Sequence, residues 1–199
     1  MQTDGRSPTL ETFALFLVVF LVQSAVGLVG VTAGWLFALG PGLAARPWTL
    51  VTSVYAHAGV SHLLANGLAL ALVGFPLERA TSRLRFHLFF VTTGALAGLA
   101  QVAVGGTLAA LGFGSPAAVL GASGAVFALY GYVVAGNRLA DGLFARLDLD
   151  PRWQVGLFAA VAVVVTLATA APGVALVAHF AGALLGLVAG RLGLLATGR

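Results

Sequence analysis

Three short segments of the chain carry side chains that could do chemistry. The first holds two imidazoles and a carboxamide, at His57, His62 and Asn66, and the other two hold Ser123 and His179. A hydroxyl, an imidazole and nearby hydrogen-bond donors are the parts of an acyl-transfer site, in which the imidazole activates the hydroxyl and the donors stabilise an oxyanion. The types of these residues therefore favour nucleophilic catalysis by a serine.

Each of these residues also has an ordinary structural explanation. A single serine in an apolar helix usually bonds back to its own helix, and a single histidine near a helix end is often only interfacial. Small residues such as Gly121 and Gly124 commonly serve helix packing. The catalytic interpretation therefore depends on whether the polar residues converge.

A Ser/His/Asp triad would need a carboxylate beside the imidazole, and the apolar runs that hold Ser123 and His179 contain no acidic residue. All six acidic residues lie in or beside the segments between the apolar runs: Asp4, Glu11, Glu78, Asp141, Asp148 and Asp150. The site is therefore expected to be a Ser–His dyad, with the imidazole oriented by packing or by a neutral partner. The same absence argues against an aspartyl protease and a carboxylate proton relay.

Neither a metal nor a cofactor is expected. No two histidines have the His-Glu-x-x-His spacing of a zinc site. Cysteine is absent, which excludes disulfides, thiolate zinc sites and a cysteine nucleophile.

The elements that must position these residues lie in a membrane. Of the 199 residues 60% are hydrophobic and only 8% charged, and the mean hydropathy is +1.03, which excludes a water-soluble domain. The net charge is +4 and the isoelectric point about 10.7, but all ten basic residues are arginines scattered between apolar runs. This pattern is typical of membrane topology, so the lipid bilayer is an expected partner and nucleic acid is not.

The charges divide the chain into four uncharged runs, 12–45, 47–77, 86–137 and 153–190, of 34, 31, 52 and 38 residues. One crossing uses about 20 residues, so each of the first two runs holds one helix and each of the last two holds two helices. Turn residues at 112–116 and 171–173 divide the longer runs. The fold class expected is an all-α membrane protein of six transmembrane helices, with a short tail at 1–12, a domain at 13–196 and helices near 13–38, 59–77, 86–109, 119–136, 153–171 and 174–195.

The first apolar segment is expected to be a retained helix, because no small-residue cleavage site follows a short core. An even number of helices places both termini on one side, together with the loops 78–85 and 137–152. That side holds all the arginines except Arg46. The positive-inside rule therefore predicts a multi-pass protein of the cell membrane with both termini cytoplasmic. The second, fourth and sixth helices then begin near the outer face, so the site opens outward.

Spacing also predicts how two of these helices pack. A histidine and three glycines recur three or four residues apart on the sixth helix, at His179, Gly182, Gly186 and Gly190. Gly124, Ala128 and Ala135 offer a matching face of small residues on the fourth helix. Small faces let helices approach closely, which would bring Ser123 Oγ within hydrogen-bond reach of His179.

In their order along the chain, these segments resemble the rhomboid family of intramembrane serine proteases. The resemblance covers Trp48 to Gly190 and rests on three motifs: His57-x4-His62-x3-Asn66, Gly121-Ala122-Ser123-Gly124, and His179 followed by Gly182 and Gly186. Each motif alone is weak, but the ordered set together with a six-helix core is specific.

The resemblance implies a serine endopeptidase that cleaves peptide bonds in or near the transmembrane segments of other membrane proteins. Ser123 would be the nucleophile and His179 the general base and then acid. His62 and Asn66, with the backbone N–H of Ser123, would stabilise the oxyanion. The residues expected to support this site are Gly121, Gly124, Phe127, His57 and Gly182.

Two positions depart from the family pattern. Phe127 stands where the family usually has a tyrosine, and Trp48-Thr49 stands where it has Trp-Arg, with Arg46 nearby. Gly74 and Glu78 match a family motif at the inner end of the second helix. We expect Gly74 to serve packing and Glu78 to pair with arginines.

Two other functions remain open from the residues alone. A catalytically inert relative that binds membrane proteins is disfavoured because Ser123 and His179 are both present. A small transporter is disfavoured because its polar groups would lie at broken helices near the midplane. The sequence identifies neither the natural substrate nor the oligomeric state.

Overall fold

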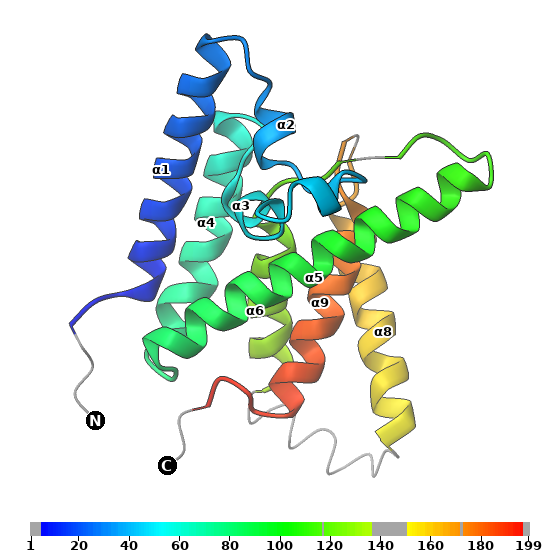
Figure 1. The fold of residues 1–199 in the computed structure, drawn as a ribbon. Helices are drawn as coiled ribbons and strands as arrows, with labels where there is room; N and C mark the ends of the chain where they lie inside the picture. Colours follow the sequence, from blue (N-terminus) through cyan, green and yellow to red (C-terminus); the bar gives the residue numbers. More distant parts are fainter. Residues whose placement is uncertain (1–4, 117, 137–150, 172, 197–199) are drawn as a thin grey trace.

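A computed structural model describes residues 5–116, 118–136, 151–171 and 173–196 of the chain (Figure 1). Regular structure in these ranges is helical throughout, which confirms the all-α class. The elements in chain order are α1 (Pro8–Leu28), α2 (Ala33–Phe37), η1 (Leu43–Ala45), α3 (Thr49–Tyr55), α4 (Val60–Leu77), α5 (Arg83–Ala110), α6 (Ser123–Ala135), α8 (Pro151–Ala168) and α9 (Leu176–Arg191). The expected tail residues 1–4 and most of the expected loop 137–152, with Asp141, Asp148 and Asp150, lie outside the described residues.

Three of the helices, α1, α4 and α5, are long and apolar enough to cross a membrane. Three shorter apolar helices, Ser123–Ala135, Trp153–Ala168 and Leu176–Arg191, accompany them. Large apolar side chains such as Leu21, Leu64 and Leu72 are exposed on the outside of the bundle. Such a surface suits hydrocarbon rather than water, as the composition predicts.

The first expected helix, 13–38, is two helices in the structure. The α1 helix begins at Pro8 because Ser7 caps it, with the Ser7 hydroxyl accepting from the backbone N–H of Leu10 at 3.2 Å. It ends at Leu28, and Gly30 then takes a positive φ of 79° that turns the chain into the separate α2. The hydropathy of this run is continuous, so it concealed the break.

The fourth expected helix also begins later than predicted, at Ser123 rather than at residue 119. The chain before it is not helical, because Val119 forms an isolated β-bridge with Leu39 and Gly121 has a φ of +135°. The start of the helix thus coincides with the candidate nucleophile.

The start of α1 and the end of α9 lie at the same end of the bundle, toward the bottom of Figure 1. Glu11 of α1 pairs there with Arg83 at 2.7 Å and with His87 at 2.8 Å. Glu78 was expected to pair with arginines, and this expectation is wrong. Its carboxylate accepts from the Ser7 hydroxyl at 2.6 Å and from the Thr9 N–H at 3.1 Å, because the N-terminus of a helix offers unpaired donors and a positive dipole end.

The tightest packing in the bundle is between α6 and α9. A Cβ at Gly182 would collide with the carbonyl oxygen of Gly124, and a Cβ at Gly186 would collide with that of Ala128. The predicted contact between small residues is therefore confirmed where Gly182 meets Gly124 and where Gly186 meets Ala128. Gly190 packs on the carbonyl of Tyr132, whereas Ala135 was the expected small residue in this part of α6.

Candidate active site

The segment that leads into Ser123 is fixed by backbone hydrogen bonds to two earlier parts of the chain. Leu39 and Val119 exchange N–H···O bonds of 2.9 and 2.7 Å, and the Gly121 N–H donates to Ser53 O of α3 at 2.9 Å. The loop that follows α2 and the α3 helix itself therefore set the position of the serine.

Ser123 is the first residue of α6, where helical N–H groups have no partner one turn back. The bond from the Val126 N–H to Ala122 O, at 2.9 Å, is the one that starts the helical ladder. The N–H groups of Ser123 to Ala125 precede that bond and point out of the positive end of the helix. Such groups suit a developing negative charge, as in an oxyanion hole.

Gly121 holds a backbone shape that brings His62 close to this serine. Its φ is +135°, and a Cβ there would lie 2.7 Å from His62 Cε1 and 3.0 Å from His62 Nε2. The imidazole of His62 therefore packs directly on the backbone two residues before Ser123. A side chain at position 121 would meet both backbone strain and the ring.

The hydrogen bond at the other side of His62 fixes its tautomer. The Ala58 N–H donates to His62 Nδ1 at 3.3 Å. A backbone nitrogen only donates, so Nδ1 is the acceptor and the neutral ring carries its proton on Nε2. The nitrogen that faces Gly121 is thus a donor, as an oxyanion-binding residue requires.

The buried ring of His57 packs against the ring of His62. The His57 side chain is only 1% exposed, and its ring meets the His62 ring edge-on at 5.2 Å between centroids. Gln23 of α1 holds the His57 backbone in both directions, because its amide accepts from the N–H at 3.1 Å and donates to the carbonyl at 3.3 Å. The motif spacing that singles out His57 does not predict its contact with Gln23, which lies 34 residues earlier.

Asn66 shares a face of α4 with His62, as its spacing predicts. Its Nδ2 donates to His62 O at 3.0 Å, and the side chain is 6% exposed. This bond is local to the helix and uses one of the two amide protons.

His179 lies in the first turn of α9, with 8% of its surface exposed. The ring of Phe127 covers it, with centroids 4.4 Å apart and planes at 43°. No side chain within α9 caps its N-terminus; instead Gln101 of α5 accepts from the N–H groups of Val177 at 3.0 Å and Ala178 at 3.2 Å. Gln101 thus holds the turn that carries His179, and only the folded chain reveals it.

Residues next to Ser123 and His179 are in contact. Gly124 follows the serine, and a Cβ there would lie 3.5 Å from the carbonyl oxygen of Ala178, the residue before the histidine. Both side chains lie within the described residues, and no hydrogen bond joins them. Catalytic hydrogen bonds are often long in unliganded enzymes and tighten when substrate binds.

The hydrogen-bond partner of the His179 side chain is instead Thr169, the residue directly after α8. His179 Nδ1 lies 3.3 Å from Thr169 Oγ1, and the same hydroxyl lies 3.0 Å from Val165 O and 3.1 Å from Thr166 O. A hydroxyl has one proton, and here two carbonyls of its own helix accept it, so Oγ1 accepts from Nδ1–H of His179. The other ring nitrogen, Nε2, is then unprotonated.

The loop between α2 and α3 is anchored despite the departure at Thr49. Arg46 donates to the carbonyl of Trp35, and Trp48 Nε1 donates to Leu36 O at 3.0 Å. Thr49 closes the turn by donating to Arg46 O at 2.7 Å. Arg46 and Trp48 together do the anchoring.

The chain is similar in sequence to several known proteins. The family model described as "Rhomboid domain" matches residues 44–196. The chain is 35% identical over 88 residues to RHOMBOID-like protein 1 of Arabidopsis thaliana, covering 44% of this chain and 20% of that protein. It is 37% identical over 94 residues to Rhomboid protease GluP of Bacillus subtilis, covering 46% and 17%, and 38% identical over 89 residues to human Rhomboid-related protein 3, covering 45% and 20%. The matches thus span about a fifth of the length of these relatives.

Proposed function

Because this chain belongs to the rhomboid family, we propose that it is an intramembrane serine endopeptidase acting on the transmembrane segments of other membrane proteins. The observation that carries the proposal is the contact of α6 and α9 beside Ser123 and His179. The rhomboid domain is proposed to extend over 13–196, somewhat beyond the matched 44–196.

In the proposed reaction, His179 Nε2 takes the proton of Ser123 Oγ as the oxygen attacks the carbonyl carbon of the scissile bond. The C–N bond then breaks, and His179 returns the proton to the leaving amine. Water then attacks the acyl-enzyme as His179 takes its proton, the ester bond to Ser123 Oγ breaks, and His179 returns the proton to that oxygen. The burial of His179 under Phe127 keeps the ring in one orientation throughout.

Three donors are proposed to stabilise the oxyanion: the backbone N–H of Ser123, His62 Nε2–H and the amide of Asn66. The tautomer of His62 supports the second, because the Ala58 bond leaves the proton on Nε2. The free N-terminal turn of α6 supports the first. Asn66 reaches the oxyanion through the amide proton that its bond to His62 O leaves over.

Thr169 is proposed as the neutral partner that takes the place of a triad carboxylate. By accepting from Nδ1–H, its hydroxyl keeps Nε2 as the basic nitrogen of His179. A hydroxyl carries no charge, so it orients the imidazole without adding the electrostatic stabilisation that an aspartate gives an imidazolium.

Both termini are proposed to be cytoplasmic, with the site opening toward the outer face. The arginine distribution supports this orientation, because the helix ends that carry Arg79, Arg83, Arg85 and Arg191 lie where α1 begins, and Arg6 directly precedes α1. The N-terminal turns of α4 and α9 belong to the other end. A reporter fused to either terminus should therefore stay inaccessible to protease added outside intact cells.

A serine-directed fluorophosphonate tests the proposed nucleophile. The detergent-solubilised protein should be labelled, and Ser123→Ala should not be. Ser24→Ala is a matched control, since Ser24 only donates to Phe20 O within α1. Ser123→Ala and His179→Ala should each abolish cleavage of a reporter transmembrane substrate. Unchanged cleavage by Ser123→Ala would exclude the proposed mechanism.

A further inference from the structure

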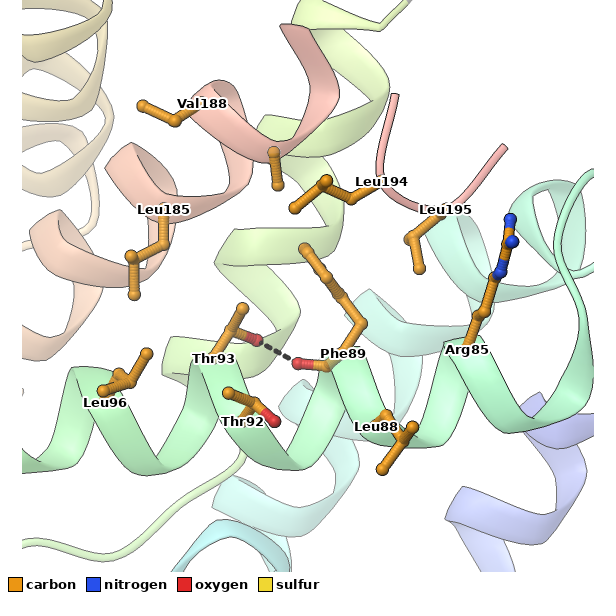
Figure 2. Close-up of a pocket in the computed structure, with 11 residues that line it drawn as sticks. Arg85, Leu88, Phe89, Thr92, Thr93, Leu96, Leu185, Val188, Leu194 and Leu195 are labelled. Carbon is orange, nitrogen blue, oxygen red and sulfur yellow. Dashed lines mark hydrogen bonds between the residues drawn. The ribbon is translucent and has the colours of Figure 1, made fainter. Parts of the chain in front are cut away.

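A groove of about 420 Å³ lies between α5 and α9, and neither Ser123 nor His179 is among the residues that line it (Figure 2). Figure 2 shows Arg85 at one end of the row of side chains that α5 contributes and Leu96 at the other. The opposite wall comes from α9 and the residues after it, including Leu185 and Leu195. The groove is open to the outside of the bundle, where lipid surrounds a membrane protein.

The groove follows α5 and is lined mostly by apolar side chains. Arg85, Leu88, Thr92 and Leu96 follow one another at intervals of three or four residues along α5, so they form one face of the helix. At 1.5 Å per residue the distance from the first to the last is about 16 Å. The hydroxyl of Thr93 donates to Phe89 O at 2.7 Å, within α5, so this wall presents little polarity.

Among the residues that line the groove, the positive charge lies at one end, near the start of α5. Arg85 is exposed and is the charged residue among those that line it. One of its terminal nitrogens donates to the carbonyl of Ala196, the residue after Leu195 of the groove wall, and this bond fixes the guanidinium beside the groove. A guanidinium has five N–H groups and is well suited to bind a phosphate.

We propose that this groove binds an anionic phospholipid, with one acyl chain along α5 and the phosphate on Arg85. A linear apolar cavity with a single cation at its end has the amphipathic shape of such a lipid. An extended peptide would bring unpaired backbone N–H and C=O groups into the groove, whereas an acyl chain brings none. Basic residues at helix ends also attract anionic headgroups.

Native mass spectrometry of the full-length protein in detergent tests the proposal. The protein is offered phosphatidylglycerol and phosphatidylcholine in equal amounts, with identical acyl chains. The wild type should retain phosphatidylglycerol about fivefold over phosphatidylcholine, the preference expected of one basic residue at an anionic headgroup. Arg85→Gln should bind both lipids equally, and Arg85→Lys should keep most of the preference.

Two further variants separate the groove from its charge. Thr92→Phe fills the groove from an exposed position and should lower the retention of both lipids. Arg79→Gln removes an exposed charge at the same end of the bundle but outside the groove, and should change neither. Fluorophosphonate labelling of Ser123 reports whether each variant is folded.

Three results would overturn the proposal. Equal retention of both lipids by the wild type would mean that the headgroup is not recognised. An unchanged preference in folded Arg85→Gln would place the lipid elsewhere. Loss of lipid together with a stable dimer mass would assign the groove to a second copy of the chain.

Discussion

Gly182 of α9 packs on the carbonyl oxygen of Gly124 in α6 with no room for a side chain between them. Gly124 adjoins the candidate nucleophile Ser123, and Gly182 lies one turn after His179. The contact that joins the two helices is therefore also the contact that sets the spacing of the proposed dyad.

Gly182→Ala should destabilise the protein, because the new Cβ forces α6 and α9 apart. Overpacking of this kind costs about 1–3 kcal/mol, and activity should fall with it. Gly106→Ala is the matched control. Gly106 lies in α5 with open space around it, and its φ is not positive, so a Cβ there meets neither a neighbour nor backbone strain. Thermal unfolding in detergent would compare the two, and an equal melting temperature would show that the helices tolerate separation.

Thr169→Val should lower kcat/KM about fivefold, because a neutral hydrogen bond contributes about 1 kcal/mol and the His179 tautomer is no longer held. Thr169→Ser should retain most of the activity. Nitrogen-15 NMR gives a second readout, since the chain has only four histidines. The wild type should show His179 protonated at Nδ1, and Thr169→Val should show a mixture of tautomers.

This pair of readouts distinguishes Thr169 from the proposed mechanism as a whole. If Thr169→Val keeps both its activity and the Nδ1–H signal, then packing under Phe127 alone orients the ring. If Ser123→Ala remains active, the mechanism fails whatever Thr169 does.

Asn66→Ala should reduce kcat about 10² to 10³-fold with little change in KM, which is the usual loss for one oxyanion donor. Fluorophosphonate labelling of Ser123 should persist, because the nucleophile and base remain. Steady-state cleavage of the reporter substrate measures both constants. An unchanged kcat would mean that the bond from Asn66 to His62 O is its whole role.

Gln101→Leu should loosen the N-terminal turn of α9, because two N–H groups lose their acceptor. Loss of a helix cap costs about 0.5–2 kcal/mol, and His179 lies one residue beyond the affected groups. We expect faster amide hydrogen exchange at Val177 and Ala178 together with lower activity. Gln101→Glu keeps the acceptor oxygen and should retain the protection; equal exchange in both variants would contradict the assignment.

The sequence by itself determined the class of the protein and predicted the members of the candidate site. Hydropathy and charge are properties of composition and order, so they already indicate apolar helices and place the arginines. Helical spacing relates His62 to Asn66, and the resemblance to the rhomboid family predicts that Ser123 and His179 join them. The glycines of α9 predicted its close packing on α6, because a residue without a Cβ lets another helix approach closely wherever two helices meet.

Only the tertiary structure decided how these side chains are held. Gln23, Gln101 and Thr169 act on residues of other elements, and the first two lie 34 and 76 residues from their partners. A hydrogen bond across such a separation leaves no periodic signal in the sequence, because it depends on where two helices come to rest. The tautomer of His62 follows from its bond with Ala58, four residues away, and that of His179 from its bond with Thr169, ten residues away. The chemistry available at each ring nitrogen therefore depends on packing as well as on residue type.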